Sequence, residues 1–150
     1  MATATIERQI SVTPSAARFY AFRLKPGEDL LEGIRAVVNA LELKAVSIVS
    51  CVGSLTRANL RFAHTGVFVE RTGHFEIVSL VGTVDAKGEH LHISISDGVG
   101  TTLGAHFGPG SSVYTTAEVV IAELTDLSFR REMCDKSGYE ELIVEKRASA

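Results

Sequence analysis

The sequence predicts an α+β fold in which a mainly antiparallel β-sheet of about seven strands is flanked by one principal helix. One stretch near the N-terminus repeats apolar residues at helical spacing, and from residue 44 onward short β-rich runs follow one another, separated by Gly, Asp and Asn. A doubly wound parallel sheet would need helices between those runs, and the sequence has none there.

The first elements are a strand, a turn and a helix. RFYAFRL at 18–24 has the β-branched and aromatic character of a strand, and KPG at 25–27 predicts a turn. In EDLLEGIRAVVNALEL, residues 28–43, apolar side chains recur at intervals of three and four residues. Because Glu28 and Asp29 stand where the helix dipole favours acidic groups, we expect a helix over this stretch.

Seven β-rich runs follow. We expect a single domain over residues 16–146, because 150 residues suffice for one hydrophobic core, with loose segments at 1–15 and 147–150. The runs are AVSIVSCVGSL (45–55), ANLRFAH (58–64), HFEIVSLVGTV (74–84), HLHISIS (90–96), TTLGAHF (101–107), AEVVIAELTDLSF (117–129) and YEELIVEK (139–146).

The charge balance argues against nucleic acid as the main partner. The net charge is -3, whereas binding to phosphates depends largely on an excess of basic side chains. The densest basic pairs, at 130–131 and 146–147, are offset by nearby glutamates. We therefore interpret both pairs as solvated surface.

The cysteines and the hydropathy pattern predict a soluble cytoplasmic protein. Cys51 and Cys134 lie far apart and outside any CxxC motif, which fits a reducing compartment. The N-terminal residues lack the apolar core of a secretory signal, and no apolar run reaches the roughly 18 residues of a membrane helix.

Three of the five histidines fall within HLHISISDGVGTTLGAH, residues 90–106. Strict alternation in HLHISIS places His90 and His92 on one face of a strand and the apolar residues on the other. The DGVG stretch at 97–100 predicts a tight reversal, so that TTLGAHF returns beside the first strand.

The register of this hairpin decides whether His106 joins the other two histidines. A five-residue loop at 97–101 places His106 opposite His92, and a three-residue loop at 97–99 places it opposite His90. A four-residue loop without a bulge would turn His106 to the wrong face. In the favourable registers three imidazoles converge, which suits a divalent metal such as zinc and leaves one coordination position open. The alternative is three solvated histidines without a ligand.

Five stretches of the sequence carry a family resemblance: FRLKPGEDLLEGI (22–34), VSCVGSLTRANLRF (49–62), GHFEIVSLVGTV (73–84), HLHISISDGVGTTLGAHF (90–107) and YTTAEVVIAEL (114–124). Together they resemble a PPC (plants and prokaryotes conserved) domain, over about residues 16–146. The resemblance implies an antiparallel sheet with a flanking helix, a homotrimer and, as in prokaryotic members, a metal site at His90, His92 and His106. The fold and the histidine pattern are also distantly similar to acetolactate decarboxylase, a zinc enzyme with three histidine ligands.

Other residues are candidates for a site. Glu76, in the HFEIVSL run that the resemblance singles out, is the first candidate for proton transfer near the metal, and Glu118 is a weaker one; both could equally be solvent-facing. Arg57 and Arg61 could line an anionic pocket, or serve only a strand connection.

Two functions therefore follow. The first is a trimeric zinc protein that binds or acts on a small anionic molecule, and any activity would be of a zinc-dependent lyase or hydrolase type. The alternative is a DNA-binding or regulatory interaction module with structural histidines, as PPC proteins are often described. Plant members pair the domain with a basic AT-hook segment, which this sequence lacks.

Overall fold

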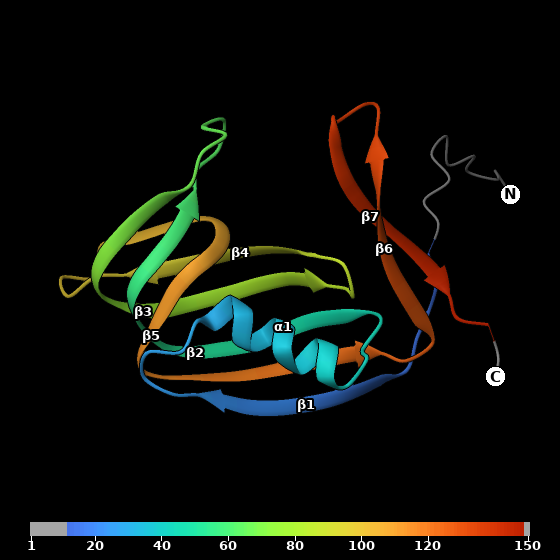
Figure 1. The fold of residues 1–150 in the computed structure, drawn as a ribbon, viewed down its shortest axis with the longest axis horizontal. Helices are drawn as coiled ribbons and strands as arrows, with labels where there is room; N and C mark the ends of the chain where they lie inside the picture. Colours follow the sequence, from blue (N-terminus) through green and yellow to red (C-terminus); the bar gives the residue numbers. More distant parts are fainter. Residues whose placement is uncertain (1–11, 149–150) are drawn as a thin grey trace, which may run out of the picture.

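The computed structural model describes residues 12–148, which form one helix and seven strands (Figure 1). The loose segments expected at 1–15 and 147–150 fall mostly outside the described residues, so the domain boundaries stay a prediction. The elements are β1 (Ala17–Leu24), α1 (Leu30–Ala40), β2 (Val46–Arg61), β3 (Val69–Val84), β4 (Glu89–Ser96), β5 (Thr102–Leu124), β6 (Leu127–Cys134) and β7 (Tyr139–Lys146).

Five strands form one antiparallel sheet in the order β1-β5-β2-β3-β4, and β4 also pairs with β5. This last pairing closes β2, β3, β4 and β5 into a barrel-like ring. Strands β6 and β7 form a separate antiparallel hairpin. The predicted fold class, a mainly antiparallel sheet of about seven strands with one helix, is confirmed.

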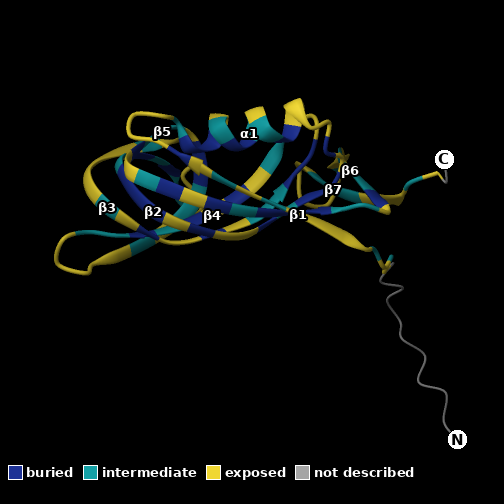
Figure 2. Cartoon of the chain, turned by 90° about the horizontal axis from the view of Figure 1, so that it is seen from below, coloured by how far each residue is buried: buried dark blue, intermediate teal, exposed yellow. Residues whose placement is uncertain are grey.

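Helix α1 covers the sheet with one apolar side. Its buried residues are Leu30, Leu31, Ile34 and Val38, while its exposed side faces away from the sheet (Figure 2). The helix is shorter than the predicted 28–43, because Asp29 stands outside it as the N-cap and accepts a hydrogen bond from the backbone N–H three residues later at 2.9 Å. With eleven residues it is too short to cross a membrane, and residues 12–148 contain no other candidate helix.

Strand β3 begins at Val69, five residues before the predicted run at 74–84, and two other strands each join two predicted runs. The runs expected at 45–55 and 58–64 are both parts of β2, and those expected at 101–107 and 117–124 are both parts of β5. The register of β2 shifts at several points against its neighbours, for example between Leu55 and Arg57. Such bulges bend a strand without ending it, so residues that resemble turn signals lie inside strands. Conversely, a turn at 125–126 divides the run 117–129 between β5 and β6.

The core lies under α1 and inside the closed strands. Alternate residues of β4 point into it, with Leu91 and Ile95 fully buried. Among the largest buried side chains from the other strands are Leu55, Leu60, Leu80, Phe107 and Ile121. The opposite face of β4 is therefore left free for polar side chains.

The β6–β7 hairpin stands to one side of the barrel (Figure 1). Arg131 on β6 ties it to the body, because its guanidinium donates to Asp85 and to Thr83 Oγ1, both at 3.1 Å. The prediction that both Arg130 and Arg131 are solvated surface is wrong for Arg131, whose side chain is only 11% exposed. Its carboxylate partner lies 46 residues away in the sequence, so local charge balance could not predict this pairing.

Candidate metal centre

Strand β4 places two of the predicted ligands on one face. His90 and His92 are exposed, while Leu91, Ile93 and Ile95 between and beyond them are buried. The predicted alternation is therefore confirmed, and it follows from the two-residue repeat of a strand.

The turn after β4 has the five-residue form. Ser96 pairs with Thr102, which leaves residues 97–101 as the loop. Asp97 Oδ1 accepts hydrogen bonds from the backbone N–H groups of Val99 and Thr101 at 3.0 and 2.9 Å. Gly100 has a φ of +83°, a conformation that glycine adopts at little cost. Asp97 thus stabilises the turn and has no hydrogen bond to a histidine among the described residues.

This turn brings the third histidine to the site. His106 on β5 pairs directly with His92 on β4, one of the two registers predicted to make the three imidazoles converge. One ligand nitrogen from each of His90, His92 and His106 lies within 4.8 Å of the others. The Nε2 atoms of His90 and His92 are 3.2 Å apart. Two nitrogens bound tetrahedrally to zinc at about 2.0 to 2.1 Å would lie about 3.3 Å apart, so this pair of nitrogens has the spacing of two zinc ligands.

The surroundings favour neutral imidazoles. Burial, and secondarily the Arg61 guanidinium, lowers the pKa of His106 to about 4. Burial, followed by the neighbouring His92, also lowers the pKa of His90 below its ordinary value. A neutral imidazole has a free lone pair, which a metal ligand requires. These two histidines are therefore ready to bind a cation near neutral pH.

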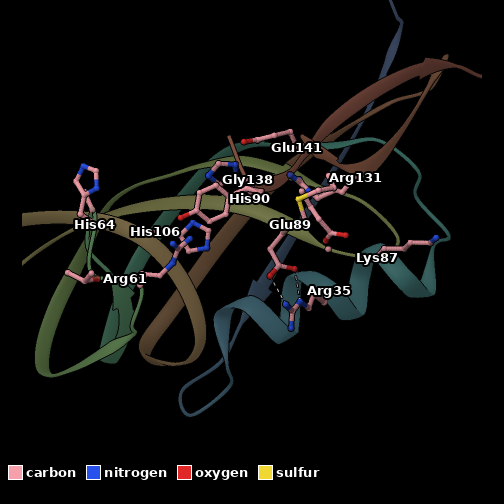
Figure 3. Close-up of a pocket in the computed structure, with 17 residues that line it drawn as sticks. Arg35, Arg61, His64, Lys87, Glu89, His90, His106, Arg131, Gly138 and Glu141 are labelled. Carbon is pink, nitrogen blue, oxygen red and sulfur yellow. Dashed lines mark hydrogen bonds and ion pairs between the residues drawn. The ribbon is translucent and has the colours of Figure 1, made fainter. Parts of the chain in front are cut away.

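Two of the three histidines, His90 and His106, line a cavity of about 1260 Å³ between the barrel and the β6–β7 hairpin (Figure 3). Arg61 lies on the barrel side, beside His106, to which its strand position is paired. Arg131, Tyr139 and Glu141 contribute from the hairpin. These hairpin residues could not be predicted as part of the site, because they lie 25 or more positions from the nearest site histidine and carry no motif of their own.

The other candidates lie elsewhere. Glu76 on β3 is exposed, pairs with Ser96 and does not line the cavity. Ser96 is four positions along β4 from His92, so Glu76 lies about 13 Å from His92 along the sheet. Glu118 is also exposed and pairs with Val52. The chain does not bring either carboxylate to the three histidines, and their proposed roles stay predictions.

The two remaining histidines are outside the triad. His64 lines the cavity from the β2–β3 loop, and His74 packs against Tyr114 with ring centroids 4.4 Å apart. Of the two arginines considered for an anionic pocket, Arg61 lines the cavity, whereas Arg57 donates to the backbone oxygen of Gly110 at 2.9 Å.

The sequence of this chain matches the model of one protein family. The model of the Plants and Prokaryotes Conserved domain, abbreviated PCC or PPC, matches residues 12–125. The chain belongs to the PPC family. The match includes all three histidines and ends before the β6–β7 hairpin, so the hairpin wall of the cavity lies beyond the matched part of the PPC domain.

The curated relatives are much longer proteins. A PPC-like part of the bifunctional protein GlmU from Synechococcus sp. (strain JA-3-3Ab) is 38% identical to the chain over 133 residues, covering 89% of the chain and 21% of that protein. GlmU from Synechococcus sp. (strain JA-2-3B'a(2-13)) is 38% identical over 135 residues, with 88% and 21% covered. The chain thus spans about a fifth of the length of the curated relatives it matches.

Solved structures share the PPC fold. A hypothetical protein from Salmonella cholerae-suis (Salmonella enterica) is 46% identical, with a TM-score of 0.89 and coverage of 91% of this chain and 99% of that one. A metal-containing protein from Archaeoglobus fulgidus is 23% identical, with a TM-score of 0.76 and coverage of 89% and 99%. A Bacteroides thetaiotaomicron protein with a provisional DNA-binding description is 17% identical, with a TM-score of 0.71 and coverage of 86% and 96%.

Proposed function

We propose that this PPC-family chain binds a divalent metal ion, zinc in the simplest case, through His90, His92 and His106, and that it holds a small anionic molecule beside the metal. The observation that carries the proposal is the convergence of three imidazole nitrogens within 4.8 Å from two paired strands. The metal-containing relative from Archaeoglobus fulgidus, which has the same fold, supports it.

The ion would bring chemistry that the side chains lack. When bound by three histidines, zinc supplies a Lewis acid with one open coordination position, and any reaction there would be of the lyase or hydrolase class. The chain's own residues hold the ion, keep His106 neutral and shape the cavity in front of it. Glu76 stays our candidate for proton transfer, but it is distant from His92 within one chain. This role would therefore require the assembly to bring Glu76 to the histidines of a neighbouring subunit.

Elemental analysis of the purified protein tests the metal site. We expect about one zinc per chain, and we expect the His92→Ala variant to lose it, because two imidazoles hold zinc far less tightly than three. His74→Ala is the matched control, since this exposed histidine packs against Tyr114 and is not part of the triad. Equal zinc content in the wild type and the His92 variant would contradict the proposal.

We further propose that the chain forms a homotrimer, as the family resemblance implies. Four valines on the adjacent strands β2 and β3, namely Val49, Val52, Val78 and Val81, are each more than half exposed. An exposed apolar surface of this kind is typical of a surface that a partner subunit covers. Light scattering on the protein as it elutes from a size-exclusion column should give three times the mass of one chain. The mass of a single chain would contradict this assembly.

A DNA-binding or regulatory module is the second candidate. The provisional DNA-binding descriptions of the Bacteroides thetaiotaomicron and Ralstonia eutropha relatives favour it, although both share under 20% identity with this chain. The net charge of -3 opposes it, because phosphate contacts need basic side chains. Binding to duplex DNA that weakens steeply with added salt would favour this second function.

We place the protein in the cytoplasm. Cys51 and Cys134, the two cysteines of the sequence, are both free thiols, and Cys51 is buried. Unpaired cysteines are usual in a reducing compartment. Fractionation of cells that express the chain would test this location.

A further inference from the structure

Three arginines line the cavity beside the histidines, and they differ in whether a carboxylate of the chain pairs with them. Arg35 donates two hydrogen bonds to Glu89, and Arg131 forms an ion pair with the buried Asp85. Arg61 has no carboxylate within ion-pair distance among residues 12–148. It is therefore the arginine of this cavity whose positive charge is not already matched by the chain.

Arg61 is also the arginine that adjoins the metal ligands. It is the last residue of β2 and pairs with His106 on β5. The Phe68 ring lies 5.9 Å from the Arg61 guanidinium carbon and 5.9 Å from the His106 ring, so one aromatic side chain contacts both groups. Figure 3 shows Arg61 next to His106, whereas Lys87 lies at the other end of the cavity.

The balance of charge around the cavity selects the class of ligand. A guanidinium recognises a carboxylate by two parallel hydrogen bonds. One unmatched arginine beside a metal suits a singly charged anion, and the acidic Glu140 and Glu141 on the hairpin side disfavour a highly charged one. A three-histidine site leaves a position for an oxygen donor of the same molecule.

We propose that Arg61 binds the carboxylate of a small monocarboxylic acid, and that a hydroxyl or carbonyl oxygen on the adjacent carbon of this acid occupies the open metal position. This inference rests on the proposed metal site and adds the residue and the ligand class. Residues of the β6–β7 hairpin line the opposite side of this cavity.

Calorimetric titration of the zinc-loaded protein with lactate tests the inference, with zinc content measured for every sample. We expect the wild type to bind lactate and to bind the neutral lactamide much more weakly. Arg61→Gln should weaken lactate binding by about tenfold or more, because a charge-assisted pair of hydrogen bonds is lost, while its zinc content stays unchanged. Arg61→Lys keeps the positive charge but loses the planar guanidinium, so its affinity for lactate should lie between those of the wild type and Arg61→Gln.

Arg71→Gln is the matched control. Arg71 also lies over an aromatic ring, 5.7 Å from the centre of Phe62, and also has no ion pair among the described residues, but it does not line the cavity. We expect it to bind lactate like the wild type. If the zinc-loaded wild type binds no lactate, or if Arg61→Gln binds lactate as tightly as the wild type, the inference fails while the metal site stands. If the wild type holds no zinc, the proposed function itself fails.

Discussion

At the scale of single residues, the site depends on a close contact behind it. Gly82 on β3 pairs with Leu91 on β4, between the two histidines of that strand. Its φ is +134°, and a Cβ atom built there would lie 1.9 Å from the backbone oxygen of His90. A glycine is therefore required for β4 to approach β3 closely enough to present its histidines.

We expect Gly82→Ala to destabilise the protein by about 3 kcal/mol and to reduce its zinc content, because both the backbone conformation and the contact with the His90 oxygen oppose a side chain. Urea unfolding measures the first effect and elemental analysis the second. Gly98→Ala is the control, since no atom lies within 4 Å of its added Cβ. Equal free energies of unfolding for Gly82→Ala and Gly98→Ala would contradict this prediction, because β3 and β4 could then move apart without loss of stability.

At the scale of elements, the β4–β5 hairpin is the unit that assembles the ligands. Its alternation and the position of its turn could be predicted, because both depend on local rules of strand periodicity and turn chemistry, whereas the sequence leaves the length of its loop open, and that length follows from the pairing of Ser96 with Thr102. The joined strands β2 and β5 were not predictable in the same way. Whether Gly108 and Pro109 end a strand or lie inside a bent one depends on pairing with β2, which is remote in the sequence.

Asp97 stabilises the turn of this hairpin through its two backbone hydrogen bonds. We expect Asp97→Ala to lower the free energy of unfolding by about 1 to 2 kcal/mol and to weaken zinc binding, because β4 and β5 are then held together less firmly. Asp97→Asn keeps the accepting oxygen and should lose much less. Isothermal denaturation of both variants checks this, and equal losses would mean that the carboxylate charge matters more than the acceptor.

At the scale of the whole molecule, the three histidines lie where the barrel closes. His90 and His92 belong to β4 and His106 to β5, the two strands whose pairing completes the ring. The wall facing them, from the β6–β7 hairpin, could not be predicted, because it depends on the remote pairing of Arg131 with Asp85. The ligands could thus be predicted from local sequence patterns, whereas their cavity is a product of tertiary structure.

A metal that binds both strands should stabilise the closed ring. We expect zinc at 100 times its dissociation constant to add about 2.7 kcal/mol to the free energy of unfolding, which corresponds to a rise in Tm of about 5 to 10 °C. Thermal unfolding with zinc and after removal of metal by a chelator measures this difference. The His92→Ala variant should show no such rise, and an equal rise in it would place the bound zinc elsewhere.

The closure of β4 on β5 also decides where the backbone can pair with another chain. In the five-stranded sheet β1, from Ala17 to Leu24, is the strand that pairs with only one other strand among the described residues, so its whole outer edge is free. An open edge invites a strand of a second molecule, which is how many sheet proteins aggregate. Here that edge is only eight residues long and bears Arg18 and Arg23, so two copies meeting there in the same way would bring like charges together. The ring that gathers the histidines therefore also leaves a single strand of the main sheet with its full edge open, and that strand is short and positively charged.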